Sequence, residues 1–385
     1  MLQAFFRQGS LVLLLLGLLA GCAGRPAPKV DEAVFWPPPP NPPRVQFLLS
    51  IDESVDVTGT DSGRSLFGYG AEEKSRNFPL IKPYGVTVAD GLVYLCEMAS
   101  GNVYRIDFAG KTFSPLPGIR DLGKMTKPIN LTRTPDGRTL VADIGRREIM
   151  VYDAAGEFVR AFGKKQKLRP SDIAADDRYI FVLDMNIAAV RVYDLNSYAY
   201  LETIGQERQG DVFLSIPTNL HLSGRQRLHV TNVGNGKVIS LDRDGHILQS
   251  FGRLGDGFGQ FGRPKGIATD EEERIYVVDA AHQNVQIFDP AGDLLMFFGE
   301  PTRKARPGEM KLPAGIEVTN DPALLRYFQP LAKPGFHLDR LILVTNHFGP
   351  HRLAIYGMGT MEGVDYTIPE PPENETKPAA KGQGG

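Results

Sequence analysis

The chain has 385 residues with 43 basic and 45 acidic side chains, which leaves a formal net charge of −2. This near balance excludes the broad positive field that usually accompanies nucleic-acid binding, or attachment to an anionic membrane by charge alone. The 42 Gly and 29 Pro residues, with almost no helical periodicity between them, are typical of an all-β chain full of turns.

A targeting segment is predicted at residues 1–21. Arg7 precedes an apolar run, Leu11–Leu19, that is too short to span a bilayer comfortably. The run ends in Leu-Ala-Gly-Cys, which resembles a bacterial lipobox and implies cleavage before Cys22 and lipidation of its sulfur. Several acyl chains would anchor the protein stably, and Ala23, where many inner-membrane lipoproteins carry Asp, favours the outer membrane. The alternative is an ordinary secretory signal with an incidental Cys22.

Residues 22–43 form a predicted Pro-rich tether. The prolines at 37–40 and 42–43 favour an extended polyproline conformation. Phe35 and Trp36 interrupt this stretch. Because two large apolar side chains are costly to leave in water, we expect them to dock onto the folded domain. The alternative is that they form a ligand for an aromatic-lined groove of a partner.

The rest of the chain repeats a unit at intervals of 42 to 49 residues. Each copy opens with a proline and a short apolar strand, and the opening residues are Pro83, Pro128, Pro170, Pro217, Pro264 and Pro313. A second strand ends in an acidic or amide residue, and a third strand follows, as in VQIFD from Val285. Short strands with turns between them at this period indicate the blades of a β-propeller.

Residues 251–299 carry the most complete copy, with GDGFGQFGRPKGIA, IYVVD, NVQIFD and AGDLLMFFG in order. These motifs resemble the NHL repeat, and the chain is identified as a bacterial lipoprotein member of the NHL-repeat six-bladed β-propeller family. The resemblance implies an all-β ring of four-stranded antiparallel blades over residues 44–358. Since the sixth copy has only three strands, residues 44–51 are expected to supply the fourth and close the ring. Residues 359–385 are predicted to be a disordered tail.

Candidate ligands at the mouth of the propeller channel come two residues after the repeat proline. Three neighbouring blades carry Asn130, Asp172 and Asn219 there, whereas the other three carry Gly. Their oxygens suit calcium, and the arrangement distantly resembles the metal-dependent six-bladed lactonases and paraoxonases, which hold a calcium ion in the channel. The acidic ligands of those enzymes have no clear counterpart here. The favoured alternative is that the three side chains hydrogen-bond local backbone.

Three histidines form a second candidate site. His282 and His347 follow the ends of the second strands in the fifth and sixth copies, and His351 lies nearby. Zinc lyases of this fold use histidines from separate blades. Because no third blade contributes, the favoured alternative is a set of exposed loop residues. The residues that end the second strands are expected to cap tight turns; they are Glu97, Asp143, Asp184, Asn232, Asp279 and Asn346.

Two surface features are candidates for partner contact. A basic patch, suited to an acidic partner or a surface polymer, is predicted from Arg146, Arg147, Lys164, Lys165, Lys167 and Arg169. Solvated loops are the equally weighted alternative. The segment LLRYFQPL, from Leu324, is expected to form a short amphipathic helix within an insertion of the sixth copy.

The favoured function is a protein-binding or scaffold module in the bacterial envelope, held at the membrane by its lipid and working as a monomeric ring that faces the periplasm or the exterior. The opening W-P-P-P-P…P-P-R resembles that of lipoproteins that accompany electron-transfer or export complexes. The alternative is a hydrolase or lyase that uses calcium or zinc at the channel mouth. No cofactor is certain, calcium is the candidate metal, and no nucleic-acid partner is expected. The fold alone does not decide between binder and enzyme.

Overall fold

The computed structural model describes residues 33–59, 77–301 and 306–367. The predicted signal peptide, Cys22, the first part of the tether and residues 368–385 lie outside these ranges. Among the described residues, no helix combines the length and the apolar character needed to cross a bilayer.

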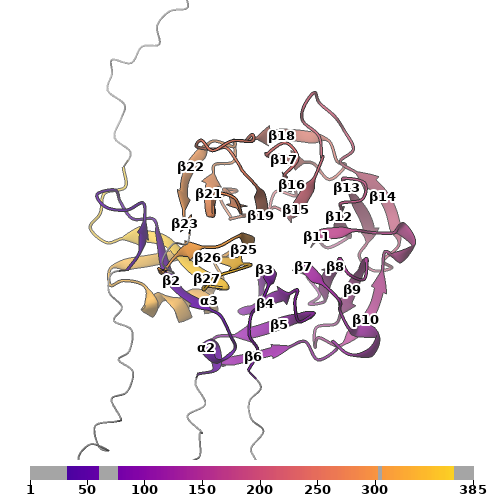
Figure 1. Ribbon diagram of the computed structural model, residues 1–385, viewed down its shortest axis with the longest axis horizontal. Coiled ribbons are helices and arrows are strands. Elements are labelled where there is room, and N and C mark those ends of the chain that lie inside the picture. The colour runs from indigo at the N-terminus through magenta and orange to yellow at the C-terminus, as the bar shows by residue number, and fades with distance from the viewer. Residues whose placement is uncertain (1–32, 60–76, 302–305, 368–385) are drawn as a thin grey trace, which may run out of the picture. The chain divides into compact units, whose positions relative to one another are not determined.

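Six antiparallel sheets stand around a central axis as the blades of a β-propeller (Figure 1). Blade I consists of β3 (Pro83–Ala89), β4 (Leu92–Glu97), β5 (Asn102–Asp107) and β6 (Thr112–Pro115). Blade II consists of β7 (Pro128–Arg133), β8 (Thr139–Asp143), β9 (Glu148–Tyr152) and β10 (Phe158–Phe162). Blade III consists of β11 (Pro170–Ala175), β12 (Tyr179–Asp184), β13 (Ala189–Asp194) and β14 (Tyr200–Ile204). In each, the strand that opens with the repeat proline is the innermost.

Blades IV and V follow the same order. Blade IV consists of β15 (Pro217–Leu222), β16 (Leu228–Asn232), β17 (Lys237–Leu241) and β18 (Ile247–Phe251). Blade V consists of β19 (Pro264–Thr269), β20 (Ile275–Asp279), β21 (Asn284–Phe288) and β22 (Leu294–Phe298). The short elements of the connections are α2 (Val55–Thr58), η1 (Asp121–Gly123), η2 (Lys164–Gln166), β23 (Glu300–Pro301), β24 (Glu309–Met310) and η3 (Gln329–Leu331). The prediction of an all-β six-bladed propeller is therefore confirmed.

Blade VI is assembled from both ends of the described chain. Its strands lie in the order β25 (Pro313–Thr319), β26 (Phe336–Asn346), β27 (Leu353–Met361), β2 (Val45–Ile51) and β1 (Phe35–Trp36). Strand β2 pairs with β27 from Val45 opposite Met358 to Ile51 opposite Leu353. The expected closure by an N-terminal strand is confirmed, and the strand covers the edge that β27 would otherwise expose.

Strand β1 adds a fifth strand to this blade from within the predicted tether. Trp36 is 9% exposed and packs between Phe298 of blade V and Tyr356 of blade VI, at centroid distances of 6.1 and 5.9 Å. Phe35 meets Phe336 edge to face at 5.2 Å. These contacts confirm the expectation that the two rings dock onto the folded domain. Docking is favourable because it removes a large apolar area from water.

The ring also continues beyond residue 358, where the sequence analysis places its end. Strand β26 is eleven residues long, and its first residues pair with the last residues of β27, from Phe336 opposite Met361. Beyond the strand, the Tyr366 hydroxyl donates to the Pro43 carbonyl at 2.7 Å and accepts the Met361 N–H at 2.8 Å. Residues 359–367 are thus part of the folded domain, so the predicted boundary between the ring and the tail at residue 358 is wrong.

The polar residues that end the second strands cap the turns, as expected. Asp143 is fully buried, and its two oxygens accept the N–H groups of residues 126, 127, 145 and 146. Asp279 accepts those of residues 262, 263, 281 and 282 in the same pattern. A buried carboxylate is stable at this position because its oxygens accept hydrogen bonds from four loop N–H groups that would otherwise bond to water.

Helix α3 (Pro322–Phe328) occupies the insertion of the sixth copy, and its expected formation is confirmed. Asp321 caps it by accepting the N–H groups of Ala323 and Leu324. Leu324 and Phe328 are 2% and 1% exposed, and Phe328 packs edge to face on Phe108 of blade I. The apolar side of the helix is therefore used inside the protein.

Candidate functional site

The inner strands β3, β7, β11, β15, β19 and β25 surround the central channel (Figure 1). Burial decreases along four of them: the first four residues of β3, β7, β15 and β25 are buried, and the following residues are half-buried. Strand β11 becomes half-buried at its last residue, and the last four residues of β19 are buried. The channel is therefore closed where the repeat prolines lie and accessible where most of these strands finish. We call these two regions the proline end and the open end.

Tyr84 seals the proline end. It is 3% exposed, and its hydroxyl donates to Asn219 Oδ1 of the opposite blade IV and accepts from Lys265 Nζ of blade V, both at 3.3 Å. Its ring packs against His347 of blade VI at 5.1 Å. One side chain of blade I thus contacts three other blades. The sequence analysis missed this role, although Tyr84 is the bulkiest residue to follow a repeat proline.

Asn130, Asp172 and Asn219 lie in the channel wall, 5%, 8% and 2% exposed. One Asp172 oxygen accepts the Ile173 N–H at 2.8 Å; the other accepts the Leu220 N–H at 2.9 Å and Asn219 Nδ2 at 3.0 Å. Asn130 Nδ2 donates to the Ser171 carbonyl at 2.8 Å. Asp172 and Asn219 are thus brought together, and all three side chains join neighbouring blades through hydrogen bonds, largely to backbone.

The environment of Asp172 favours protonation of its carboxylate. Burial raises the pKa of Asp172 to about 7, although the N–H groups of Leu220 and Ile173 and the Asn219 amide hold it down. No cation contributes to this balance. The carboxylate is therefore stabilised by amide donors alone, which is the role of a structural hydrogen-bond acceptor.

A cavity of about 150 Å³ occupies the channel between Asp172 and the open end. Four residues after their repeat prolines, polar side chains from four blades line it: Thr87, Thr132, His221 and Glu317. Alternate residues of a strand point to the same side, so this ring of side chains is the next layer along the channel after Asn130, Asp172 and Asn219. The sequence analysis stopped at the first layer and missed the second.

Glu317 and His221 are the titratable groups of the second layer. Burial raises the pKa of Glu317 to about 8, against hydrogen bonds from Val88 and Thr87, and its Oε1 accepts the Val88 N–H at 3.4 Å. Burial lowers the pKa of His221 to about 4. At neutral pH the cavity thus contains a carboxylic acid and a neutral imidazole, which can donate and accept protons without a fixed charge.

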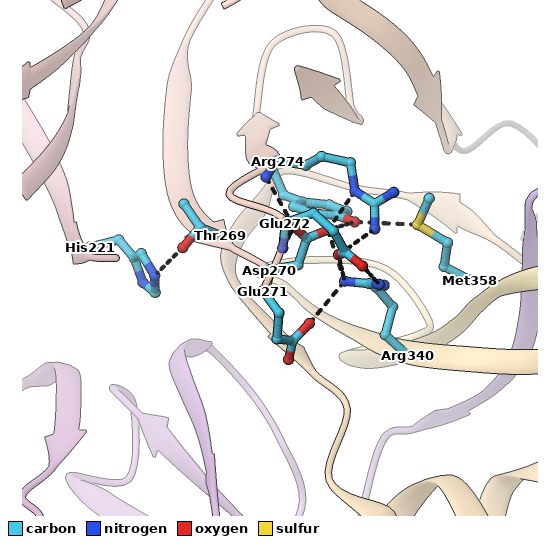
Figure 2. A network of polar contacts seen from close by, with 9 residues as sticks. His221, Thr269, Asp270, Glu271, Glu272, Arg274, Arg340 and Met358 are labelled. Carbon is cyan, nitrogen blue, oxygen red and sulfur yellow. Dashed lines mark hydrogen bonds and ion pairs between the residues drawn. The ribbon is translucent and has the colours of Figure 1, made fainter. Parts of the chain in front are cut away.

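A network of ion pairs fixes the rim beside His221 (Figure 2). His221 Nε2 lies 3.0 Å from Thr269 Oγ1, and the adjacent Asp270 receives Arg274 Nε at 2.7 Å and Arg340 Nη1 at 2.9 Å. Arg340, from β26, also pairs with the carboxylates at 271 and 272. These contacts bind the β19–β20 turn of blade V to blade VI and hold Thr269 in place for His221.

The three candidate histidines have separate partners. His282 pairs with Asp279 and Asp256, at 2.9 and 3.2 Å. His351 bonds Ser50 Oγ at 2.7 Å and the carbonyl of residue 306 at 3.1 Å, while His347 packs on Tyr84. Over residues 33–59, 77–301 and 306–367, no group of three or more His, Cys, Asp or Glu is arranged to hold a metal ion.

The predicted basic patch divides into two kinds of side chain. Arg146 Nη1 donates to the carbonyls of residues 122 and 124, and Arg147 donates to those of 167 and 168, so both guanidinium groups fasten loops. The other four members are exposed in the β10–β11 connection, namely Lys164, Lys165, Lys167 and Arg169. Within the predicted patch, the four residues of the connection are therefore the ones whose charged groups are not used to hold a loop in place.

Comparison with known proteins supports the fold. No family model matches the chain. The E3 ubiquitin-protein ligase TRIM71 of Mus musculus is 28% identical over 164 residues, which cover 41% of this chain. The match covers 17% of TRIM71, so this chain corresponds to a small part of that relative. The match to TRIM71 is thus a partial one, which supports an NHL-like repeat in part of this chain and nothing about the rest of that protein.

Solved structures give the same architecture. A gluconolactonase from Xanthomonas campestris superposes with a TM-score of 0.53 at 17% identity, covering 88% of this chain and 100% of that one. An auxiliary nutrient binding protein from Bacteroides ovatus gives a TM-score of 0.53 at 12% identity, covering 72% and 69%. At such identities the likeness shows the propeller fold and leaves activity open.

Proposed function

We propose that this chain is a lipid-anchored propeller of the bacterial envelope that binds a protein partner. The lipobox-like Leu-Ala-Gly-Cys sequence ending at Cys22 supports the anchor. The prolines at 37–40 and 42–43 lie in the connection between β1 and β2, so they belong to the ring, and the extended polyproline conformation expected for them is corrected to a turn of blade VI. The observation that supports the binding role is an exposed aromatic groove on blade V.

The groove lies between the loop before β19 and the outermost strand of blade V. Phe258 is 83% exposed and Phe297 is 43% exposed, and their rings stack at 5.8 Å. A cavity of about 400 Å³ lies beside them, with Asp256, His282 and Pro301 among its lining residues. Two more exposed apolar side chains stand on the same two segments, Leu254 before β19 and Leu295 in β22, each 54% exposed. Aromatic anchors surrounded by polar residues are typical of protein-binding sites.

The loop that carries Phe258 does not need this ring for its own structure. Gln260 accepts the Gly257 N–H through its side chain, and its carbonyl accepts the Gln286 amide at 2.9 Å. Phe261, in the same loop, is fully buried and supplies the packing. Phe258 is therefore exposed to water on a loop that other residues hold in place. Binding of an apolar segment of a partner would remove this ring from water, which is favourable.

The test combines the anchor and the groove. Cys22→Ser in the full chain should release the protein from membranes without changing its thermal unfolding. Phe258→Ser with Phe297→Ser should abolish in-cell cross-links to a defined partner band, while Leu201→Ser on the outer strand of blade III, where residue 201 is 46% exposed, should retain them. Membrane retention of the Cys22 variant would refute the anchor. Identical cross-links in all variants would refute the groove.

A hydrolase or lyase acting in the channel is the second candidate function. The observation that favours it is the cavity in which Glu317 and His221 stand without a fixed charge between them. Glu317→Gln would then abolish turnover of a small ester or lactone and leave the cross-links of the groove unchanged, which separates the two functions.

A further inference from the structure

Four positive side chains act electrostatically on His347, whose ring packs on Tyr84 at the proline end of the channel. They come from blade I, blade V and blade VI, and the group consists of Lys82, Arg263, Lys265 and Arg352. Burial, and then these four cations, lower the pKa of His347 to about 4. Since His347 packs on the Tyr84 ring, the positive field is centred where the channel is sealed.

Lys265 is the most enclosed member of this group. Its ammonium donates to the Tyr84 hydroxyl at 3.3 Å and lies 5.5 Å from the centre of that ring. Burial, and next the charge of Arg263, lower the pKa of Lys265 to about 8. A carboxylate partner would stabilise the half-buried Lys265, but within the described ranges no ion pair forms to it, to the half-buried Lys82 or to the exposed Arg263.

The acidic groups next to this cluster are already engaged. Asp172, on the channel side of Tyr84, is bonded to two amide N–H groups and to Asn219. Glu97 and Asp279 cap the turns and accept the backbone N–H groups of Lys82 and Arg263. Arg352 donates to the carbonyls of residues 81 and 347, so part of its capacity is used. Three cations remain without a direct anionic partner.

We propose that the proline end carries an anion site in which Lys82, Arg263 and Lys265 bind one phosphate group over the Tyr84 hydroxyl. Arg263 acts on Lys265, and both act with Lys82 on His347, so the three cations lie within reach of one another's charge. Three neighbouring cations match the two charges and several acceptor oxygens of a phosphate better than the single charge of a carboxylate. The site lies on the sealed face, away from the cavity that contains Glu317, and it does not depend on the blade V groove. A free phosphate and a phosphate ester offer the same dianionic group, so inorganic phosphate is a suitable probe.

The first measurement follows Lys265 in the folded wild-type chain. Lysines of the full chain in detergent are reductively methylated with a carbon-13 label, and their NMR signals are titrated with pH in chloride and in phosphate at equal ionic strength. Bound phosphate favours the charged amine, so the pKa of Lys265 should rise from about 8 towards its ordinary value of 10.5. Identical titrations in the two salts would overturn the proposal.

Variants then assign the site. Lys265→Gln should weaken phosphate binding about tenfold or more, as expected for loss of one charge-assisted contact. Lys164→Gln removes an exposed lysine of the β10–β11 connection and should bind phosphate like the wild type. Phosphate stabilises most proteins weakly by exclusion from their surface, so the decisive result is the difference between variants. Equal thermal shifts in wild type and Lys265→Gln would refute the site. Equal binding of acetate would refute its assignment to phosphate.

To test phosphate esters directly, glycerol phosphate replaces inorganic phosphate in the same NMR titration. A rise in the pKa of Lys265 with both anions indicates that the site accepts the ester, and a rise with inorganic phosphate alone indicates a site for the free ion. Either result supports an anion site, and the absence of both refutes it.

Discussion

The two ends of the channel are built from the same six strands but use their polar residues differently. At the proline end, Asp172 and Asn219 are bonded to each other, and Tyr84 covers them. At the open end, His221 and Glu317 keep part of their surface on a cavity and have few partners. The layer two residues after the repeat proline therefore joins blades, while the layer four residues after it is free to meet a ligand.

This difference follows from where solvent can reach. Next to Tyr84, a polar side chain without a partner would lose its hydrogen bonds to water and form none in their place. Asp172 and Asn219 therefore form hydrogen bonds to neighbouring blades. In the cavity, water can solvate Thr87, Thr132 and Glu317 until a ligand replaces it. Along one strand, a position that joins neighbouring blades is thus followed by a position with fewer polar partners beside the cavity.

The largest effect is expected from opening the ring that keeps both ends in place. Deleting residues 44–51 removes β2, exposes the edge of β27 and loses the buried Val45 and Ile51. At about 1.5–3 kcal/mol for each large buried side chain, these two losses alone approach half of a typical stability of about 5–15 kcal/mol. We expect aggregation or a much lower midpoint in thermal unfolding followed by circular dichroism. A peptide of residues 33–59 added in trans should restore part of the loss, and an unchanged midpoint would contradict the closure.

Asp172→Ala tests the proline end directly. The substitution leaves the Leu220 N–H, the Ile173 N–H and the Asn219 amide without their acceptor. Each unsatisfied buried donor costs about 1–3 kcal/mol, so a loss of about 3 kcal/mol or more is expected in urea unfolding. Asp177→Ala, at an exposed neighbouring carboxylate, is the matched control and should change stability by less than about 0.5 kcal/mol. Equal effects of the two substitutions would show that Asp172 is no structural acceptor.

The repeat made the ring and its closure predictable from sequence. Pro83 to Pro313 mark the innermost strands, and the missing strand of the sixth copy pointed to residues 44–51. The same periodicity located Asn130, Asp172 and Asn219 on one layer. It did not show that Tyr84 closes the channel over them, because that contact joins opposite blades and depends on the reach of one side chain.

The second layer was missed for a related reason. Residues 87, 132, 221 and 317 are Thr, Thr, His and Glu, so no single residue type marks this layer in every blade as the repeat proline does. Their burial and the raised pKa of Glu317 arise only when the strands converge. The extension of β27 and the strand β1 were also missed: they pair with the neighbouring strands β26 and β2, and the Pro-rich residues beside them do not show the alternation expected of a strand.

Glu317 is expected to make stability depend on pH at the open end. Its pKa rises from 4.5 to about 8 on folding, so the folded protein holds a proton that the unfolded chain releases. The contribution is full below about pH 4.5 and is lost as pH rises to about 8. The whole shift corresponds to about 5 kcal/mol as an upper limit, which solvent at this half-buried side chain reduces. Asp172 adds a slope of the same sign up to about pH 7. The difference between wild type and Glu317→Gln in urea unfolding isolates Glu317, and parallel pH profiles would contradict its raised pKa.

The smallest effect is expected from calcium at the proline end. A site filled at 100 times its dissociation constant would stabilise the fold by about 2.7 kcal/mol. Amide donors already occupy both oxygens of Asp172, and coordination would have to displace the Leu220 and Ile173 N–H groups. We therefore expect that Asp172 does not bind calcium, so calcium should change the midpoint of thermal unfolding equally in the wild type and in Asp172→Asn. A shift removed by Glu317→Gln but kept by Asp172→Asn would place calcium in the open-end cavity and favour the hydrolase or lyase. A shift removed by Asp172→Asn alone would restore the first layer as the metal site and break the division between the two ends.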